Sequence, residues 1–230
     1  MTPVPSERYT IGVGSTHQVS ALLERPGTAR ALLVLAHGAG TGMTHPSLQA
    51  LATGLAERGI ATLRYQFPYM ERGSRRPDPP ALCQATVRAA VAEASHLAPH
   101  LPLFAGGRSF GGRMTSAAQA LSPLPQVRGL VFLAFPLHPA GRPGSGRAAH
   151  LSRLTVPLLF IQGTRDALAQ KDLLEPLIER LGARARVHWL LDADHGLHVA
   201  ARSGRTDADV REEYLEVLSR WLEFIASAAK

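Results

Sequence analysis

Short apolar runs alternate along the chain with longer segments in which apolar residues recur at helical spacing. The apolar runs lie at 31–36, 60–65, 101–105, 127–134, 156–161 and 187–191. Such continuous runs are typical of strands that are buried on both faces of a sheet. The segments of helical spacing lie at 46–58, 81–97, 110–121, 173–181 and 209–226. This alternation of strand and helix predicts a mostly parallel sheet with helices on both faces.

The segment before residue 31 has a different pattern. Residues 9–13 and 18–23 are strand-like and are joined by Gly14 and Ser15, which predicts an antiparallel hairpin. With this hairpin the sheet has about seven or eight strands. No linker or internal repeat divides the chain, so we expect a single domain over residues 1–230 without a separate cap domain.

Composition excludes several classes of protein. The chain has 230 residues and one cysteine, Cys83, so we expect neither an internal disulfide nor a cysteine-based metal centre. No apolar run reaches the ~18 residues of a membrane-spanning helix, and residues 1–8 lack the apolar core of a secretory signal. We therefore expect a soluble, cytoplasmic protein without membrane association. No H-E-x-x-H motif is present, and we expect no metal or other cofactor.

Charge changes this picture little. The formal net charge is +7, from 25 lysines and arginines against 18 acidic residues. The arginines are spread along the chain, with one modest cluster at Arg72, Arg75 and Arg76. Proteins that bind nucleic acid usually gather such charge on one stripe or tail. We therefore expect a solvated basic surface and no nucleic-acid partner.

A G-x-S-x-G motif follows the strand-like run at 101–105. It consists of Gly107, Arg108, Ser109, Phe110 and Gly111, and a helical segment begins at once. A serine on a sharp strand-to-helix turn needs small residues at both ±2 positions, and the turn exposes its hydroxyl. The motif in this context predicts that Ser109 is a nucleophile.

A serine hydroxyl is a poor nucleophile and needs a base that is itself held by an acid. On a sheet of this kind the chain order is serine, acid, histidine. Asp166 and His195 follow the next-to-last and last strand-like runs, in that order. His198, in the same loop, is the rival base, but we expect His195, which comes first and is flanked by Gly196, to be catalytic.

Acyl transfer also needs two donors for the oxyanion of the tetrahedral intermediate. One is the amide of Phe110, the residue after the nucleophile. The loop that follows the 31–36 run contains small residues, and the amide of Ala39 is the candidate for the second donor. His37 precedes this loop, and we expect it to have a structural hydrogen-bonding role rather than a catalytic one.

These motifs resemble those of the α/β-hydrolases, specifically a small, nearly capless family that is distantly similar to dienelactone hydrolases. Eukaryotic relatives of that family include a testis-expressed protein and a subunit of a histone acetyltransferase complex. The matching stretches are 36–40 with Met43 and 45–46, then 64–70, 106–113, 135–139, 162–166 and 194–195. The resemblance implies the α/β-hydrolase fold and the triad of Ser109, Asp166 and His195, but it does not indicate a substrate.

Two excursions follow strands and are expected to form the pocket, at 68–80 and 135–155. Residues expected to line it are Phe67, Tyr69, Met70, Leu137 and His138. Phe110 and Met114 are further candidates, although the helical position of Met114 favours the core. The arginines of the two excursions, at 72, 75, 76, 142 and 147, lead to the hypothesis of a substrate that carries a carboxylate or phosphate.

The leading functional prediction is a serine hydrolase that cleaves a carboxylic ester or thioester of a small acyl substrate through an acyl-enzyme. The same groups could cleave a dienelactone or a small amide, and the sequence does not separate these reactions. The alternative is a catalytically silent hydrolase-fold module that binds a protein partner. The expected partner of the enzyme is a small-molecule substrate, and assembly into a homo-oligomer is left open.

Overall fold

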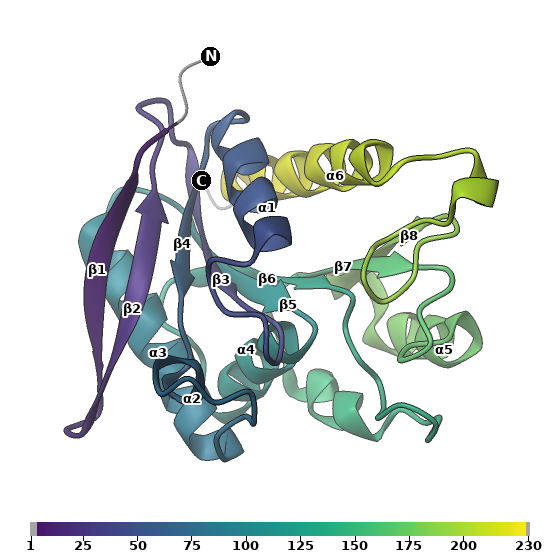
Figure 1. The fold of residues 1–230 in the computed structure, drawn as a ribbon, viewed down its shortest axis with the longest axis horizontal. Coiled ribbons are helices and arrows are strands. Elements are labelled where there is room, and N and C mark those ends of the chain that lie inside the picture. Colours follow the sequence, from purple (N-terminus) through teal and green to yellow (C-terminus); the bar gives the residue numbers. More distant parts are fainter. Residues whose placement is uncertain (1–3, 229–230) are drawn as a thin grey trace.

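The computed structural model describes residues 4–228, so that residues 1–3 and 229–230 of the expected domain lie outside it. The strands of the described chain form one eight-stranded sheet in the order β1-β2-β4-β3-β5-β6-β7-β8 (Figure 1). Their bounds are β1 Ser6–Val13, β2 His17–Glu24, β3 Ala31–Ala36, β4 Ile60–Tyr65, β5 Leu103–Arg108, β6 Val127–Leu133, β7 Leu158–Gly163 and β8 Ala185–Leu190.

The sheet is parallel except at its N-terminal edge. β1 and β2 form an antiparallel hairpin, and β2 also runs antiparallel to β4. All later neighbours pair in parallel, from β3–β4 through β7–β8. The six residues of β3 are all buried, as a strand covered on both faces requires. The predicted mostly parallel sheet with an N-terminal hairpin is confirmed.

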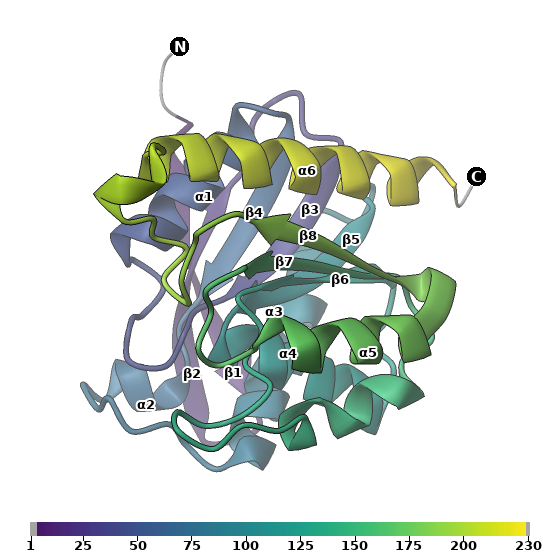
Figure 2. The ribbon, with the colours of Figure 1, turned by 90° about the vertical axis from the view of Figure 1, so that its right-hand side faces the viewer.

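Helices cover both faces of the sheet (Figures 1 and 2). α1 and α6 lie on one face, and α3, α4 and α5 lie on the other. Their bounds are α1 Pro46–Ala56, α3 Pro80–Leu97, α4 Phe110–Leu121, α5 Lys171–Leu181 and α6 Asp207–Ser227. Two apolar cores result, one on each face of the sheet, and they fix the strand ends from which the loops emerge.

The last helix shows how local sequence sets an element boundary. The side chain of Thr206 accepts a hydrogen bond from the backbone N–H of Asp209, and the Asp209 carboxylate accepts one from the N–H of Thr206. This reciprocal capping satisfies two N–H groups that a helix start otherwise leaves free. The cap begins α6 close to the predicted start of the helical segment.

The two excursions and the bounds of several strands, β5 most clearly, differ from the prediction. The first excursion contains α2, a single turn at Pro68–Glu71, and the second contains a 3₁₀ helix at Gly146–Arg153. β5 begins only at Leu103, because Pro102 has no N–H for the ladder, and it continues through the glycines to Arg108. A Cβ on Gly106 would lie 2.0 Å from the carbonyl oxygen of Val131 in the adjacent strand, so only glycine fits there.

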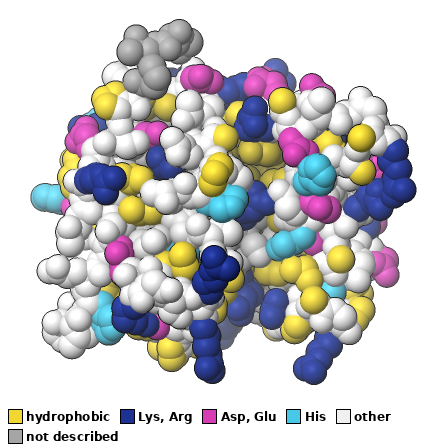
Figure 3. Space-filling view, viewed as in Figure 1, with side chains coloured by type: hydrophobic (Ala, Val, Ile, Leu, Met, Phe, Trp, Pro, Cys, Tyr) yellow, Lys and Arg dark blue, Asp and Glu magenta, His cyan; other side chains and the backbone are white. Residues whose placement is uncertain are grey.

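Charged side chains of both signs are mixed on the surface. On the face in Figure 3, arginine and lysine side chains are interspersed with acidic and uncharged ones. Within residues 4–228, no helix has both the length and the apolar character required to cross a membrane.

Candidate active site

The loops that follow β3, β5, β7 and β8 leave the sheet at its carboxyl edge. Parallel strands place all these loops on the same side, which is where open α/β sheets hold their ligands. Ser109 is the residue directly after β5, and α4 begins at the next residue. Asp166 follows β7, and His195 follows β8.

Ser109 has a strained backbone. Its φ and ψ are 48° and −112°, in a region that L-residues rarely occupy, and its N–H donates to the Leu133 carbonyl at 2.9 Å. A Cβ on Gly107 would lie 2.4 Å from the carbonyl oxygen of Ala36, and one on Gly111 would lie 2.6 Å from the same atom. The glycines two positions before and two positions after Ser109 therefore allow the turn to pack directly against the end of β3.

The structure brings Ser109, His195 and Asp166 into one chain of hydrogen bonds. Ser109 Oγ lies 2.8 Å from His195 Nε2, and His195 Nδ1 lies 2.8 Å from Asp166 Oδ2. The imidazole is 29% exposed, whereas the Asp166 side chain is inaccessible to solvent. Asp166 therefore holds the Nδ1 side of the ring, and the Nε2 side contacts the serine.

Two further donors hold the carboxylate of Asp166. Gln162 Nε2 donates to Asp166 Oδ2 at 2.5 Å, and the backbone N–H of Leu168 donates to Oδ1 at 2.8 Å. Gln162 is itself fully buried, and its Oε1 accepts from the N–H of Phe135 at 2.9 Å. Each carboxylate oxygen therefore has at least one donor besides solvent, and the plane of the carboxylate is fixed toward His195.

The loops that carry the acid and the base are joined to each other and to β5. The N–H of Arg165 donates to the carbonyl of Ala193 at 2.9 Å, and a Cβ on Gly163 would lie 2.2 Å from that same oxygen. From the other side, the Arg108 guanidinium donates to the carbonyl of Gly196, the residue after His195. Arg108 directly precedes Ser109, and its side chain therefore connects the end of β5 to the loop that contains His195.

His37 anchors the loop after β3. Its Nδ1 donates to the Gly38 carbonyl at 2.7 Å, and its Nε2 accepts from the N–H of Phe67 at 3.1 Å. Burial lowers the pKa of His37 to about 4, so the ring is neutral and can act as donor and acceptor at once. Thr41 Oγ1 also donates to the Gly38 carbonyl, at 3.0 Å.

His198 points elsewhere. Its Nδ1 lies 2.8 Å from Asp207 Oδ2, and its side chain is 62% exposed. The hydrogen bond that the ring donates to the Asp207 carboxylate raises the pKa of this histidine. Of the two histidines in the loop, it is His195 that the structure places against Ser109.

A cavity of about 380 Å³ opens at Ser109. Its lining residues are Ala39, Pro77, Asp78, Pro80, Ser109, Phe110, Arg113, Pro136, Arg147 and Leu168. Both residues predicted to supply oxyanion donors, Ala39 and Phe110, therefore share a cavity with the serine. As the first residue of α4, Phe110 has no acceptor for its N–H within the helix.

The five residues predicted to line the pocket do not line this cavity, which is a correction to the predicted wall. Phe67, Tyr69, Leu137 and His138 are buried, and Met70 is half-buried. Phe67 and Tyr69 turn inward because α2 begins at Pro68 and directs both rings onto Phe110, at centroid distances of 5.5 and 6.3 Å. The two rings therefore pack against the Phe110 side chain and do not face the cavity.

The arginines differ from the prediction too. Of the five expected at the mouth, only Arg147 lines the cavity. The second cavity arginine is Arg113, which lies on α4 one turn after Ser109. That position was readable from helical spacing, since residues four apart share a helix face. The contacts of Arg108 and Gln162 depend on how separate loops approach each other, and no local pattern indicates them.

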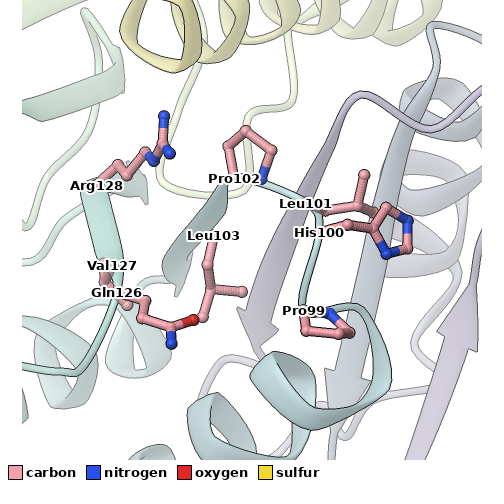
Figure 4. A pocket seen from close by; sticks show the side chains of 8 residues that line it. All are labelled: Pro99, His100, Leu101, Pro102, Leu103, Gln126, Val127 and Arg128. Atoms are coloured by element: carbon pink, nitrogen blue, oxygen red, sulfur yellow. The ribbon is translucent and has the colours of Figure 1, made fainter. Parts of the chain in front are cut away.

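A larger hollow, of about 520 Å³, lies away from these loops (Figure 4). It is at the amino ends of β5 and β6, and its lining residues are Pro99, His100, Leu101, Pro102, Leu103, Gln126, Val127 and Arg128. This wall has no hydroxyl nucleophile beside its histidine. Within the described part of the chain, no group of three or more His, Cys, Asp or Glu side chains is arranged to hold a metal ion.

The fold is shared with several solved structures. One is XC6422 from Xanthomonas campestris, described as an α/β serine hydrolase without a lid, with 21% identity, a TM-score of 0.73, and coverage of 96% of this chain and 97% of that one. A dienelactone hydrolase from Anabaena variabilis has 20% identity, a TM-score of 0.78 and the same coverage. TT1662 from Thermus thermophilus has 26% identity and a TM-score of 0.69, with 96% and 99% covered.

The sequence itself matches a family model, that of the alpha/beta hydrolase domain, over residues 29–223. The matched region runs from just before β3 into α6 and includes every loop that contributes to the site. The chain therefore belongs to the alpha/beta hydrolase domain family.

Proposed function

We propose that the protein is a serine hydrolase that cleaves a carboxylic ester or thioester of a small acyl group through an acyl-enzyme. The observation that carries the proposal is the continuous pair of 2.8 Å contacts from Ser109 Oγ through His195 to Asp166. Such a chain lets one proton leave the serine as its oxygen attacks, while the acid stabilises the imidazolium that forms.

In the first half of the reaction Ser109 Oγ attacks the acyl carbon, and His195 Nε2 takes the hydroxyl proton. The tetrahedral intermediate collapses, the bond to the leaving oxygen or sulfur breaks, and His195 returns the proton to the leaving group. In the second half His195 takes a proton from water, the resulting hydroxide attacks the acyl carbon, and Ser109 leaves with that proton. Asp166, held by Gln162, keeps the ring in one orientation through both halves.

The N–H groups of Phe110 and Ala39 are the proposed oxyanion donors. His37 and Thr41 hold the Gly38 carbonyl on the protein side. A trans peptide is planar, so the N–H of Ala39 points away from that carbonyl, and Ala39 lines the same cavity as Ser109. Two donors held in place before the reaction stabilise the developing negative charge without reorganisation.

The size of the cavity supports a small acyl substrate. A volume of about 380 Å³ is at the lower end of the range for small-molecule sites, and the residues after β6 form a 3₁₀ turn rather than a lid domain. Among the solved structures of the same fold, the names serine hydrolase, dienelactone hydrolase and esterase domain support hydrolysis of an ester bond.

The two histidines of one loop supply the test. We expect His195→Ala to lower kcat for a short 4-nitrophenyl ester by about 10³-fold or more, because the serine loses its base. His198→Ala, in the same loop but bonded to Asp207, is the matched control and should retain wild-type kcat. Equal losses in the two variants would contradict the assignment. A wild-type protein that hydrolyses no short ester or thioester would instead support the silent binding module.

A further inference from the structure

Two guanidinium groups line the cavity that contains Ser109. Arg113 and Arg147 come from different elements, α4 and the 3₁₀ helix at Gly146–Arg153. The N–H of Arg113 donates to the Ser109 carbonyl at 3.1 Å, so Arg113 lies one helical turn from the serine and on the same helix face. The helix that begins directly after the serine therefore also carries one of the two guanidinium groups of the cavity wall.

Arg113 has no counter-ion within residues 4–228. Its guanidinium lies 5.5 Å from the centroid of the Phe110 ring, and its Nε is buried without a hydrogen-bond partner among the described residues. Burial and the nearby charge of Arg147 both lower the pKa of Arg113. A buried donor without a partner costs stability that a bound acceptor would restore.

The side chain of Arg147 makes one hydrogen bond to the described residues, from Nη1 to the backbone carbonyl of His138 at 3.1 Å. This contact fixes the side chain without neutralising its charge. The single acidic residue of the cavity wall is Asp78, whose Oδ1 is paired with Arg72 and whose Oδ2 has no hydrogen-bond partner among the described residues. Neither Arg113 nor Arg147 forms an ion pair within residues 4–228, and the wall has two guanidinium groups against one carboxylate.

We propose that Arg113 and Arg147 form a carboxylate-binding subsite for the acyl part of the substrate. The substrate class is then a half-ester or half-thioester of a short dicarboxylic acid, with its free carboxylate directed into the cavity. The inference rests on the proposed hydrolase function and adds the substrate class. Paired guanidinium groups suit a carboxylate, because their N–H groups bind both oxygens through charge-assisted hydrogen bonds.

The anion belongs to the acyl side rather than to the leaving group. The leaving atom must receive its proton from His195 Nε2 and so must lie next to that ring. His195 does not line the cavity, whereas Ser109, Phe110 and Ala39 do. The group that enters the cavity is therefore the one that remains attached to the serine after the leaving group departs.

Three ethyl esters of similar size test the charge preference: ethyl hydrogen succinate, neutral ethyl levulinate and cationic ethyl 4-aminobutyrate. Wild-type kcat/KM, measured by pH-stat titration, should fall by about tenfold or more from the anionic to the neutral ester, and further for the cationic one. In Arg113→Met and Arg147→Met, the ratio of kcat/KM for succinate ester to levulinate ester should fall about 10- to 100-fold. Arg113→Lys keeps the positive charge but not the paired N–H groups of the guanidinium, so the ratio should fall less than in Arg113→Met.

Arg142→Met is the matched control. Arg142 is an exposed arginine of the same excursion that does not line the cavity, so its loss lowers the net charge equally but should leave the ratio unchanged. An equal fall in this variant would assign the preference to long-range steering and overturn the subsite. Equal wild-type rates for all three esters would overturn it as well, while leaving the hydrolase function intact. Failure to hydrolyse any ester would instead refute the proposed function. Arg147→Met decides the matter if Arg113→Met does not fold.

Discussion

His37 makes the stability of the protein sensitive to mild acid. The neutral ring donates to the Gly38 carbonyl and accepts from the N–H of Phe67. Protonation would place a second N–H against the Phe67 donor and a charge in a fully buried position. The folded protein therefore resists protonation, and burial lowers the pKa of His37 from 6.5 to about 4.

The sign and size of the effect follow from this difference. Between these two pKa values the unfolded chain binds a proton at His37 that the folded protein does not, so the free energy of unfolding decreases as the pH falls. A shift of this size corresponds to a loss of about 2 kcal/mol between pH 7.5 and pH 5 and about 3 kcal/mol by pH 4. The contribution is fully present above pH 6.5. His150, whose pKa burial also lowers to about 4, adds a loss of the same sign.

His37→Gln removes the titration, while its amide can still donate to Gly38 and accept from Phe67. Urea unfolding measures the free energy of unfolding of both proteins from pH 7.5 to pH 5. This free energy should decrease less in the variant than in the wild type, by about 2 kcal/mol. The comparison uses the change in the free energy of unfolding with pH, so a lower stability of the variant at pH 7.5 does not affect the result. His198→Asn is the control, since the pKa of His198 is raised and its contribution is instead lost as the pH rises. Parallel pH profiles for wild type and His37→Gln would refute the reasoning.

Two further substitutions test the packing around the serine. Arg108→Met should lower kcat for short esters about 10- to 100-fold with little change in KM, because the His195 loop loses its hydrogen bond to the end of β5. Arg108→Lys should recover part of the loss in kcat. A change in KM alone would contradict this role of Arg108. Gly111→Ala places a Cβ 2.6 Å from the Ala36 carbonyl oxygen and should lower Tm by about 6–12 °C in calorimetry. Gly12→Ala, with no atom within 4 Å of the added Cβ, should change Tm little, and similar shifts in both would contradict the close packing.

The strand ends of the site were predictable because the relevant signals are local. Continuous apolar runs predict buried parallel strands, and parallel strands bring their carboxyl ends to one edge. Ser109, Asp166 and His195 each follow such a run directly, so their proximity depends only on the order of strands in the sheet. The choice of His195 over His198 as the base depended on position within the loop and stays a prediction. In the structure His195 contacts Ser109, whereas His198 contacts Asp207.

The cavity wall was not predictable from the same signals. The excursions after β4 and β6 have no periodicity, so nothing in them tells an inward aromatic ring from an outward one. Phe67 and Tyr69 pack under Phe110, and this arrangement depends on where α2 begins. Arg113 could be placed by helical spacing alone, but the absence of a counter-ion among its described neighbours becomes visible only when the separate loops are assembled.

Covalent labelling of Ser109 tests the central claim most directly. A fluorophosphonate reacts with an activated serine hydroxyl and forms a stable phosphonyl ester, so intact-protein and peptide mass spectrometry report both stoichiometry and position. The account predicts one adduct per chain, on Ser109, and none in Ser109→Ala. No adduct on the folded wild type, or an adduct that persists in Ser109→Ala, would contradict the claim that Ser109 is the nucleophile.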